Sequence, residues 1–269
     1  MKVFVVDSSR CNGCYNCQIV CKDEHCGNDW SPYAMPQPDT GQFWLKLNER
    51  VRGNVPHVKV SYWAVMCQHC TDAPCMAACP IKDCIYRRPD GLVIIDPKKC
   101  TGCQKCISAC PYGRIFYNKD LHLAQKCTGC AHLLDRGWKE PRCVDACPTE
   151  AIKFGEEADL KDLIAKAEAL EPDTGSGPKT RVYYLNLPKK FIAGTVYDPG
   201  TKEVVIGAEC TLTGEGQTFT QTTNEWGDFW FEGLKAGQYS LKIDKAPKTK
   251  TIGPLSTEKD LGLGDIPLS

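Results

Sequence analysis

Cysteine supplies most of the side chains in this sequence that could do chemistry. The chain has 269 residues and 19 of them are cysteine, about 7%, which is far above ordinary usage. Sixteen fall at short, fixed intervals into four groups of four. The groups are Cys11, Cys14, Cys17 and Cys21; Cys67, Cys70, Cys75 and Cys79; Cys100, Cys103, Cys106 and Cys110; and Cys127, Cys130, Cys143 and Cys147. Regular short spacing is typical of metal ligation, so we expect these sixteen thiols to be metal ligands.

The spacing within the groups indicates iron–sulfur clusters. The first and third groups read C-x2-C-x2-C-x3-C, the second reads C-x2-C-x4-C-x3-C, and the fourth has a long gap between its inner members. A C-x2-C-x2-C loop directs three thiolates at one cubane. The fourth cysteine, which we expect to start a helix that leads away, ligates the other cluster of a two-cluster ferredoxin unit. The sequence thus predicts four [4Fe–4S] clusters in two such units, and the spacing alone leaves open which groups pair.

Two other uses of cysteine explain the pattern less well. A disulfide framework is typical of short secreted chains with irregular spacings. Zinc prefers two separated C-x2-C pairs, not triplets with a distant fourth ligand. The proline that follows the last cysteine of three groups, at Pro80, Pro111 and Pro148, also belongs to the ferredoxin pattern.

Three cysteines, Cys26, Cys84 and Cys210, remain outside the groups. Free cysteine usually behaves as a small buried hydrophobe, and we expect that role for all three. His69 and His132 lie inside or beside cysteine loops. They either donate hydrogen bonds to sulfur, which would raise a cluster potential, or are polar loop residues without such a role.

Lysines stand beside several of the cysteines. They are Lys98, Lys99, Lys105 and Lys126. Positive charge near an anionic cluster stabilises its reduced state, and the alternative is an ordinary solvated basic face. The formal net charge is zero when thiols are counted as neutral, but a chain loaded with four clusters would carry roughly −8. Nucleic acid is therefore not expected as a partner.

The sequence lacks the patterns of a catalytic site. There is no nucleophile–base constellation, and neither Gly175–Gly177 nor Gly214–Gly216 continues into a dinucleotide fingerprint. We therefore expect an electron conductor with no catalytic residues of its own. No apolar run is long enough to span a membrane, and the N-terminal residues do not read as an export signal. We expect a cytoplasmic protein, with export on a signal-bearing partner as the alternative.

Short strands are expected around the cysteine groups, in a strand–loop–helix rhythm. They are Lys2–Val6, Leu92–Ile95, Arg114–Tyr117 and Ala151–Phe154. An aromatic-rich insert, residues 22–66, separates the first two groups and contains the expected strands Phe43–Leu47 and His57–Trp63. Apolar residues at helical spacing predict a helix over Glu156–Leu170, and Pro172–Lys179 has the composition of a linker.

The C-terminal part has a different character. Short β-rich segments alternate there with Gly-rich turns: Ile192–Tyr197, Val204–Leu212, Gln217–Thr222, Asp228–Phe231 and Gly237–Ile243. This pattern predicts a small antiparallel β-sandwich, and it resembles the transthyretin-like or carboxypeptidase-regulatory type. The predicted class is α+β: a four-cluster domain over residues 1–190, made of two interleaved bacterial-type ferredoxin units, and a sandwich over residues 191–269.

The full series of four groups resembles the iron–sulfur subunits of molybdopterin oxidoreductases of the dimethyl sulfoxide reductase family. That resemblance implies pairing of the first group with the fourth and of the second with the third. The implied ligand sets are Cys11, Cys14, Cys17 and Cys147; Cys127, Cys130, Cys143 and Cys21; Cys67, Cys70, Cys75 and Cys110; and Cys100, Cys103, Cys106 and Cys79.

A narrower resemblance rests on Cys21–His25, Gln125–Asp135, Arg181–Tyr184 and the C-terminal domain. These are similar to the small subunits of pyrogallol–phloroglucinol transhydroxylase and resorcinol hydroxylase. The resemblance implies an anaerobic heterodimer with a large subunit that holds molybdopterin guanine dinucleotide with molybdenum or tungsten and acts on a phenolic compound. An external electron carrier and a higher oligomer of the heterodimer are further partners it allows. Such transhydroxylase subunits have lost ligands of one group, whereas this chain keeps all sixteen.

Three alternatives stay open at this point. The complex could serve a respiratory reductase for arsenate, polysulfide or tetrathionate. The chain could be a free-standing polyferredoxin that serves several enzymes. Its clusters could also be structural, in an interaction protein.

Overall fold

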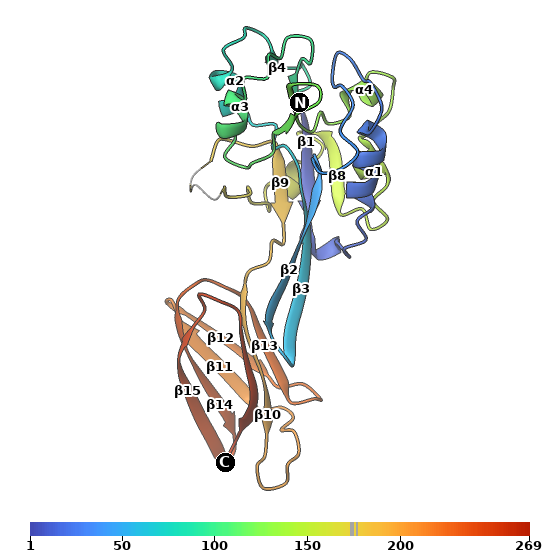
Figure 1. Ribbon diagram of the computed structural model, residues 1–269. Helices are drawn as coiled ribbons and strands as arrows, with labels where there is room; N and C mark the ends of the chain where they lie inside the picture. Colours follow the sequence, from blue (N-terminus) through green and yellow to red (C-terminus); the bar gives the residue numbers. More distant parts are fainter. Residues whose placement is uncertain (173–174, 176) are drawn as a thin grey trace. The chain divides into compact units, whose positions relative to one another are not determined.

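The computed structural model describes residues 1–172, 175 and 177–269, and the chain divides into two compact units (Figure 1). The first unit comprises Met1–Glu49 and Tyr62–Leu187, and the second comprises Arg50–Ser61 and Pro188–Ser269. The division near residue 188 lies close to the expected domain boundary, but residues 50–61 group with the second unit, whereas the sequence analysis placed them in the first domain. Part of the expected linker, at residues 173, 174 and 176, lies outside the described residues.

A three-stranded sheet at the centre of the first unit pairs the first strand of its sequence with the last two. Strand β1 (Lys2–Asp7) pairs antiparallel with β8 (Ile152–Glu156) and parallel with β9 (Val182–Leu185). Its continuous apolar run Val3–Val6 is buried, as expected for a central strand with both faces covered. Because β1 precedes the first cysteine group and β8 follows the fourth, this pairing brings those two groups together.

Two small antiparallel hairpins flank the third cysteine group. The first pairs β4 (Ile85–Arg87) with β5 (Val93–Ile95), and the second pairs β6 (Phe116–Asn118) with β7 (Leu123–Gln125). A longer hairpin is formed by β2 (Lys46–Asn54) and β3 (His57–Val65). The strand expected to begin at Phe43 begins at Lys46, whereas the strand expected at His57 begins there.

The helices are short, and strands predominate over the described residues. The helices are the 3-10 turn η1 (Ser8–Arg10), α1 (Asn16–His25), α2 (Pro74–Ala78), α3 (Lys105–Ser108), α4 (Ala131–Leu134), α5 (Arg142–Asp145) and α6 (Lys161–Ile164). No helix in this part of the chain is long and apolar enough to cross a membrane.

The prediction of a helix over Glu156–Leu170 is wrong. Strand β8 extends through Glu156, and only the short α6 is helical. Beyond it, the backbone of Glu168 exchanges two hydrogen bonds of 2.8 Å with that of Tyr184 in β9. Pairing with the edge of the sheet satisfies backbone groups that a longer helix would have satisfied internally, so the tertiary contact overrides the apolar periodicity.

The second unit contains two sheets. The strands are β10 (Lys190–Tyr197), β11 (Glu209–Gly214), β12 (Gln217–Thr222), β13 (Asp228–Leu234), β14 (Gln238–Lys245), β15 (Lys248–Ser256) and β16 (Leu261–Pro267). One sheet has the order β13-β10-β16 and the other the order β12-β11-β14-β15. The expectation of wholly antiparallel pairing is wrong, because β16 runs parallel to β10. A strand that returns from the opposite sheet has no short hairpin to fix it antiparallel to its neighbour.

The two sheets of the second unit share one hydrophobic core. Along β14, Tyr239, Leu241 and Ile243 are buried and alternate with exposed residues. They belong to the same core as Phe229 and Phe231 of β13 in the other sheet. This period-2 alternation is what two facing sheets require.

Candidate metal centres

The cysteine loops share a left-handed backbone position. The residue before the second cysteine of each group has a positive φ: 75° at Gly13, 45° at His69, 70° at Gly102 and 63° at Gly129. Glycine accepts this conformation without steric cost, so three loops use it. The second group holds a histidine there at the cost of backbone strain.

The third cysteine of each group lies in a helix. Cys17 is in α1, Cys75 in α2, Cys106 in α3 and Cys143 in α5. The fourth cysteine follows four residues later, so the expectation that it starts the helix is wrong. The helix begins at or just before the third cysteine, and one helical turn carries the chain away to the fourth.

Two of the four implied ligand sets lie in the part of the first unit built on α1 and α5. We call Cys11, Cys14, Cys17 and Cys147 the Cys11 set; together they line one pocket. The Cys21 set comprises Cys21, Cys127, Cys130 and Cys143, all four of which are buried. After burial, the largest effects on the Cys21 thiol come from Cys127 and Cys130, which raise its pKa further. Those sulfurs are therefore close together.

The other two sets lie around α2 and α3. The Cys67 set, which comprises Cys67, Cys70, Cys75 and Cys110, lines a second pocket. The Cys79 set, which comprises Cys79, Cys100, Cys103 and Cys106, lines a third. In both pairs of sets, cysteines from two sequence groups meet, because α1 packs against α5 and α2 against α3. This grouping is the one that the family resemblance implies.

Backbone N–H groups point at the cysteine sulfurs in every set. Donor-to-sulfur distances are 3.2 Å from Ala151 to Cys147, 3.4 Å from Gly129 to Cys127, 3.5 Å from His69 to Cys67, 3.4 Å from Arg114 to Cys110, and 3.4 Å from Ala124 to Cys100. Such donors stabilise negative charge on sulfur, and hydrogen bonds to sulfur are one of the means by which a protein sets a cluster potential.

The sets fit a polynuclear cluster better than a single ion. Zinc held by four thiolates would require the sulfurs to converge on one point about 2.3 Å from each. Among the described residues, no three Cys, His, Asp or Glu side chains do so; the sulfurs of three sets instead line a pocket each. Burial raises the pKa of the Cys17, Cys70, Cys106 and Cys130 thiols to about 12.

The effects of thiols on one another indicate which sets are neighbours. The Cys17 thiol is close enough to that of Cys143 to raise its pKa, Cys67 likewise acts on Cys127, and Cys75 acts on Cys106, each adding to the larger effect of burial. The order is therefore the Cys11, Cys21, Cys67 and Cys79 sets. Only the two terminal sets contain an exposed cysteine, Cys14 at one end and Cys103 at the other.

The three remaining cysteines differ in environment. Cys210 is fully buried in the core of the second unit, as expected. Cys84 is also buried, but it lines the same cavity as the Cys79 set. Burial, followed by Cys79 and Cys100, raises its pKa to about 12, so it is a neutral S–H beside that set. Cys26 is only partly buried and faces Asp39 at 3.3 Å, so the expectation of a buried residue is wrong there.

The histidines beside the loops have defined partners. His69 is fully buried, and its Nδ1 accepts a 3.0 Å hydrogen bond from the backbone of Val93. His132 Nε2 lies 2.9 Å from a carboxylate oxygen of Glu24, and its ring stacks on Trp30. His132 therefore uses that nitrogen for an acidic residue of α1, not for sulfur.

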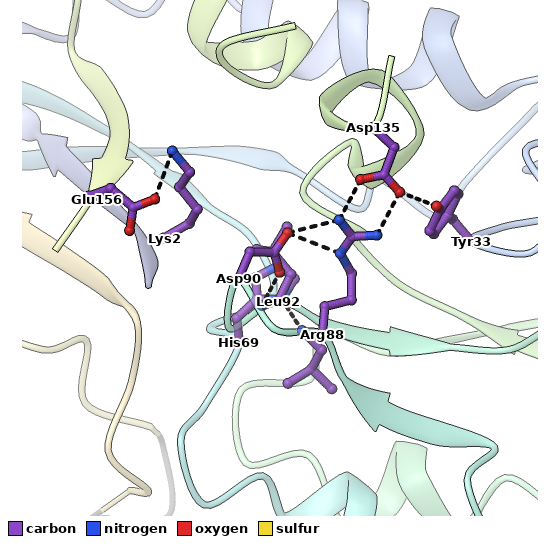
Figure 2. Close-up of polar contacts among 9 residues, drawn as sticks. Lys2, Tyr33, His69, Arg88, Asp90, Leu92, Asp135 and Glu156 are labelled. Atoms are coloured by element: carbon purple, nitrogen blue, oxygen red, sulfur yellow. Dashed lines mark hydrogen bonds and ion pairs between the residues drawn. The ribbon is translucent and has the colours of Figure 1, made fainter. Parts of the chain in front are cut away.

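An ion-pair network that the sequence did not reveal ties the two pairs of sets together. Figure 2 shows the Arg88 guanidinium between the carboxylates of Asp90 and Asp135. Arg88 and Asp90 lie in the turn between β4 and β5, whereas Asp135 follows α4 and also accepts a hydrogen bond from Tyr33. Hydrogen bonds from Arg88 and Tyr33 lower the pKa of Asp135 to about 2. The network joins the half of the unit that holds the Cys67 and Cys79 sets to α4.

Comparison with known domain families divides the chain as the structure does near residue 190. The 4Fe-4S dicluster domain family matches residues 58–157, which contain the last three cysteine groups. The carboxypeptidase regulatory-like domain family matches residues 192–260. The chain therefore combines a ferredoxin-type part with a regulatory-like β-domain.

Curated relatives define the family. The small subunit of pyrogallol hydroxytransferase from Pelobacter acidigallici is 35% identical over 98% of both chains. The probable anaerobic dimethyl sulfoxide reductase chain YnfG of Escherichia coli is 34% identical over 63% of this chain and 80% of its own length. The iron–sulfur subunit of arsenate respiratory reductase from a Shewanella species is 29% identical over 72% of this chain and 98% of its own length. The chain belongs to the family of iron–sulfur electron-transfer subunits of molybdopterin oxidoreductases, and the resemblance found in its motifs is confirmed.

Proposed function

We propose that the chain carries four [4Fe–4S] clusters, one on each of the four cysteine sets, and conducts electrons along them. The collection of all sixteen cysteines into four sets, each with N–H donors on sulfur, supports this proposal. Each cluster would supply a centre that takes up and releases one electron. The chain's residues would ligate the clusters, exclude water from the fully buried Cys21 set and keep the sets in a fixed order.

The order of the sets suggests where electrons enter and leave. The inner Cys21 set is buried throughout, whereas the Cys11 and Cys79 sets each contain an exposed cysteine, Cys14 and Cys103. We infer that one end of the chain of clusters faces the catalytic subunit and the other faces an electron carrier.

We propose further that the partner is a large molybdopterin subunit, with molybdenum or tungsten, that acts on a phenolic compound. The observation that carries this proposal is the match to a pyrogallol hydroxytransferase small subunit over 98% of both chains, which includes the second unit. The dimethyl sulfoxide reductase relative matches only 63% of this chain. We also infer that the two sheets of the second unit form a β-sandwich that serves in docking.

The test uses the native complex, purified anaerobically. Molybdenum or tungsten is measured, and the complex is then mixed with a polyhydroxybenzene, with arsenate or with tetrathionate while the cluster spectra are followed. We expect a stoichiometric second metal and a change of cluster redox state with the polyhydroxybenzene alone. A response to arsenate or tetrathionate alone would contradict the phenolic substrate, and a chain that purifies without partner or second metal would favour a free polyferredoxin.

A further inference from the structure

The five-residue sequence Lys-Cys-Thr-Gly-Cys occurs twice, at residues 99–103 and 126–130, and its two lysines have opposite environments. The side chain of Lys99 is 48% exposed and lies 3.8 Å from the carboxylate of Asp96. Lys126 is only 2% exposed. The preceding elements account for the difference, because Lys126 directly follows the buried strand β7, whereas Lys99 lies in an exposed turn.

Lys126 has no acidic partner in the part of the chain that the structure describes. Its Nζ donates to the backbone carbonyl of Val93 and, at 3.0 Å, to that of Cys127. Lysine is a cation with three N–H donors. A buried charge without a counter-charge is strongly unfavourable, so such groups are paired or lie beside a metal centre.

The lysine lies at the middle junction in the order of the sets. Its Nζ donates to the carbonyl of Cys127, which belongs to the Cys21 set, and to that of Val93, which lines the pocket of the Cys67 set. One buried cation therefore lies beside two neighbouring sets.

The peptide groups of Val93 connect this lysine to the loop of the Cys67 set. The carbonyl of Val93 accepts from Lys126, and its N–H donates to Nδ1 of His69, which lies between Cys67 and Cys70. Because Nδ1 is the acceptor, the proton of the neutral ring is on Nε2, which is buried without a hydrogen-bond partner among the described residues. The junction therefore contains a buried cation and a buried N–H donor. Neither group has a carboxylate partner among the described residues.

We propose that Lys126 is a buried counter-charge that stabilises the one-electron reduced states of the two inner clusters, those of the Cys21 and Cys67 sets. The inference rests on the proposed four-cluster function. Reduction adds one negative charge to a cluster, and a fixed positive charge in a low-dielectric interior makes that addition more favourable. Electrons then cross the middle of the chain without a deep drop in potential between the two halves.

The test is a redox titration of the full chain, followed by EPR, for the wild type, Lys126→Met, Lys126→Arg and the matched control Lys99→Met. In Lys126→Met we expect the reduction equilibrium of two clusters to fall at least tenfold, which is about 59 mV for one electron. The other two clusters should move less. Lys126→Arg keeps the charge and should therefore keep most of the wild-type potential of those two clusters, and Lys99→Met should leave all four potentials near the wild-type values.

Several results would overturn the inference. One is an unchanged set of potentials in Lys126→Met, and another is a shift of equal size in Lys126→Arg or Lys99→Met. Should Lys126→Met lose iron, full iron in Lys126→Arg supports a requirement for charge, whereas loss in both variants assigns the position to packing and contradicts the proposal. The iron content of the wild type separates failure of this inference from failure of the proposed function. Fewer than four clusters in the wild type would contradict the proposed function, whatever the variants show.

Discussion

Left-handed backbone positions at single residues determine where the cysteine sulfurs and their N–H donors point. Gly13, Gly102 and Gly129 recur before the second cysteine of their groups, and His69 takes the same place in the second group. The cysteine spacing makes this loop type predictable from sequence. The individual donors to sulfur, such as Ala124 on Cys100, are not predictable, because they come from residues brought close only by the fold.

The ligand assignment predicts a selective effect of one substitution. Cys147→Ser should lower the iron content by about four per chain, because Cys147 shares its cavity with Cys11, Cys14 and Cys17. The signals of the Cys67 and Cys79 clusters should persist. The measurement is iron analysis with EPR of the reduced chain.

Cys84→Ala is the matched control for that substitution, because Cys84 lines the cavity of the Cys79 set without belonging to it. Its iron content should equal that of the wild type. Loss of iron in Cys84→Ala, or loss of the Cys79 cluster instead of the Cys11 cluster in Cys147→Ser, would show that the ligand sets are wrongly assigned.

At the scale of elements, the local sequence pattern predicts where strands lie but not how elements distant in sequence pair. The short strands were predictable to within a few residues, since β1 and β5 are apolar runs and the first part of β3 alternates between polar and apolar residues. The length of α6 and the parallel pairing of β10 with β16 were not, because both depend on partners distant in sequence. The hairpin β2–β3 was foreseen as strands, but not the grouping of its tip with the second unit.

The tip of that hairpin is held within the second unit by a buried ion pair. Arg52 lies 3.1 Å from Asp260, and their side chains are 7% and 5% exposed. Arg52→Met should reduce the free energy of opening of this unit by about 3 kcal/mol, because it leaves Asp260 buried without its counter-charge. Hydrogen exchange of the β10 and β16 amides measures this free energy.

Lys59→Met provides the control, since Lys59 lies on the same hairpin and pairs with Glu232 of β13, with side chains 31% and 57% exposed. An exposed pair contributes at most about 1 kcal/mol. Equal effects of the two substitutions would contradict a special role for the buried pair.

At the scale of the whole molecule, the chain joins a ferredoxin-type unit to a β-rich unit that matches the carboxypeptidase regulatory-like domain family. Composition and turn spacing made the division near residue 190 predictable. The sharing of each set between two cysteine groups was not, because it follows from how α1 packs on α5 and α2 on α3. Identical local sequence around Lys99 and Lys126 likewise gives no sign that one lysine is buried between two sets.

The central claim is that this one chain holds four [4Fe–4S] clusters on sixteen cysteines. The most direct test is to count iron, acid-labile sulfide and zinc in the full chain purified anaerobically, and to quantify the reduced clusters by EPR. The claim predicts about sixteen iron and sixteen sulfide per chain, with four reducible centres. About twelve iron per chain, or stoichiometric zinc, would contradict it.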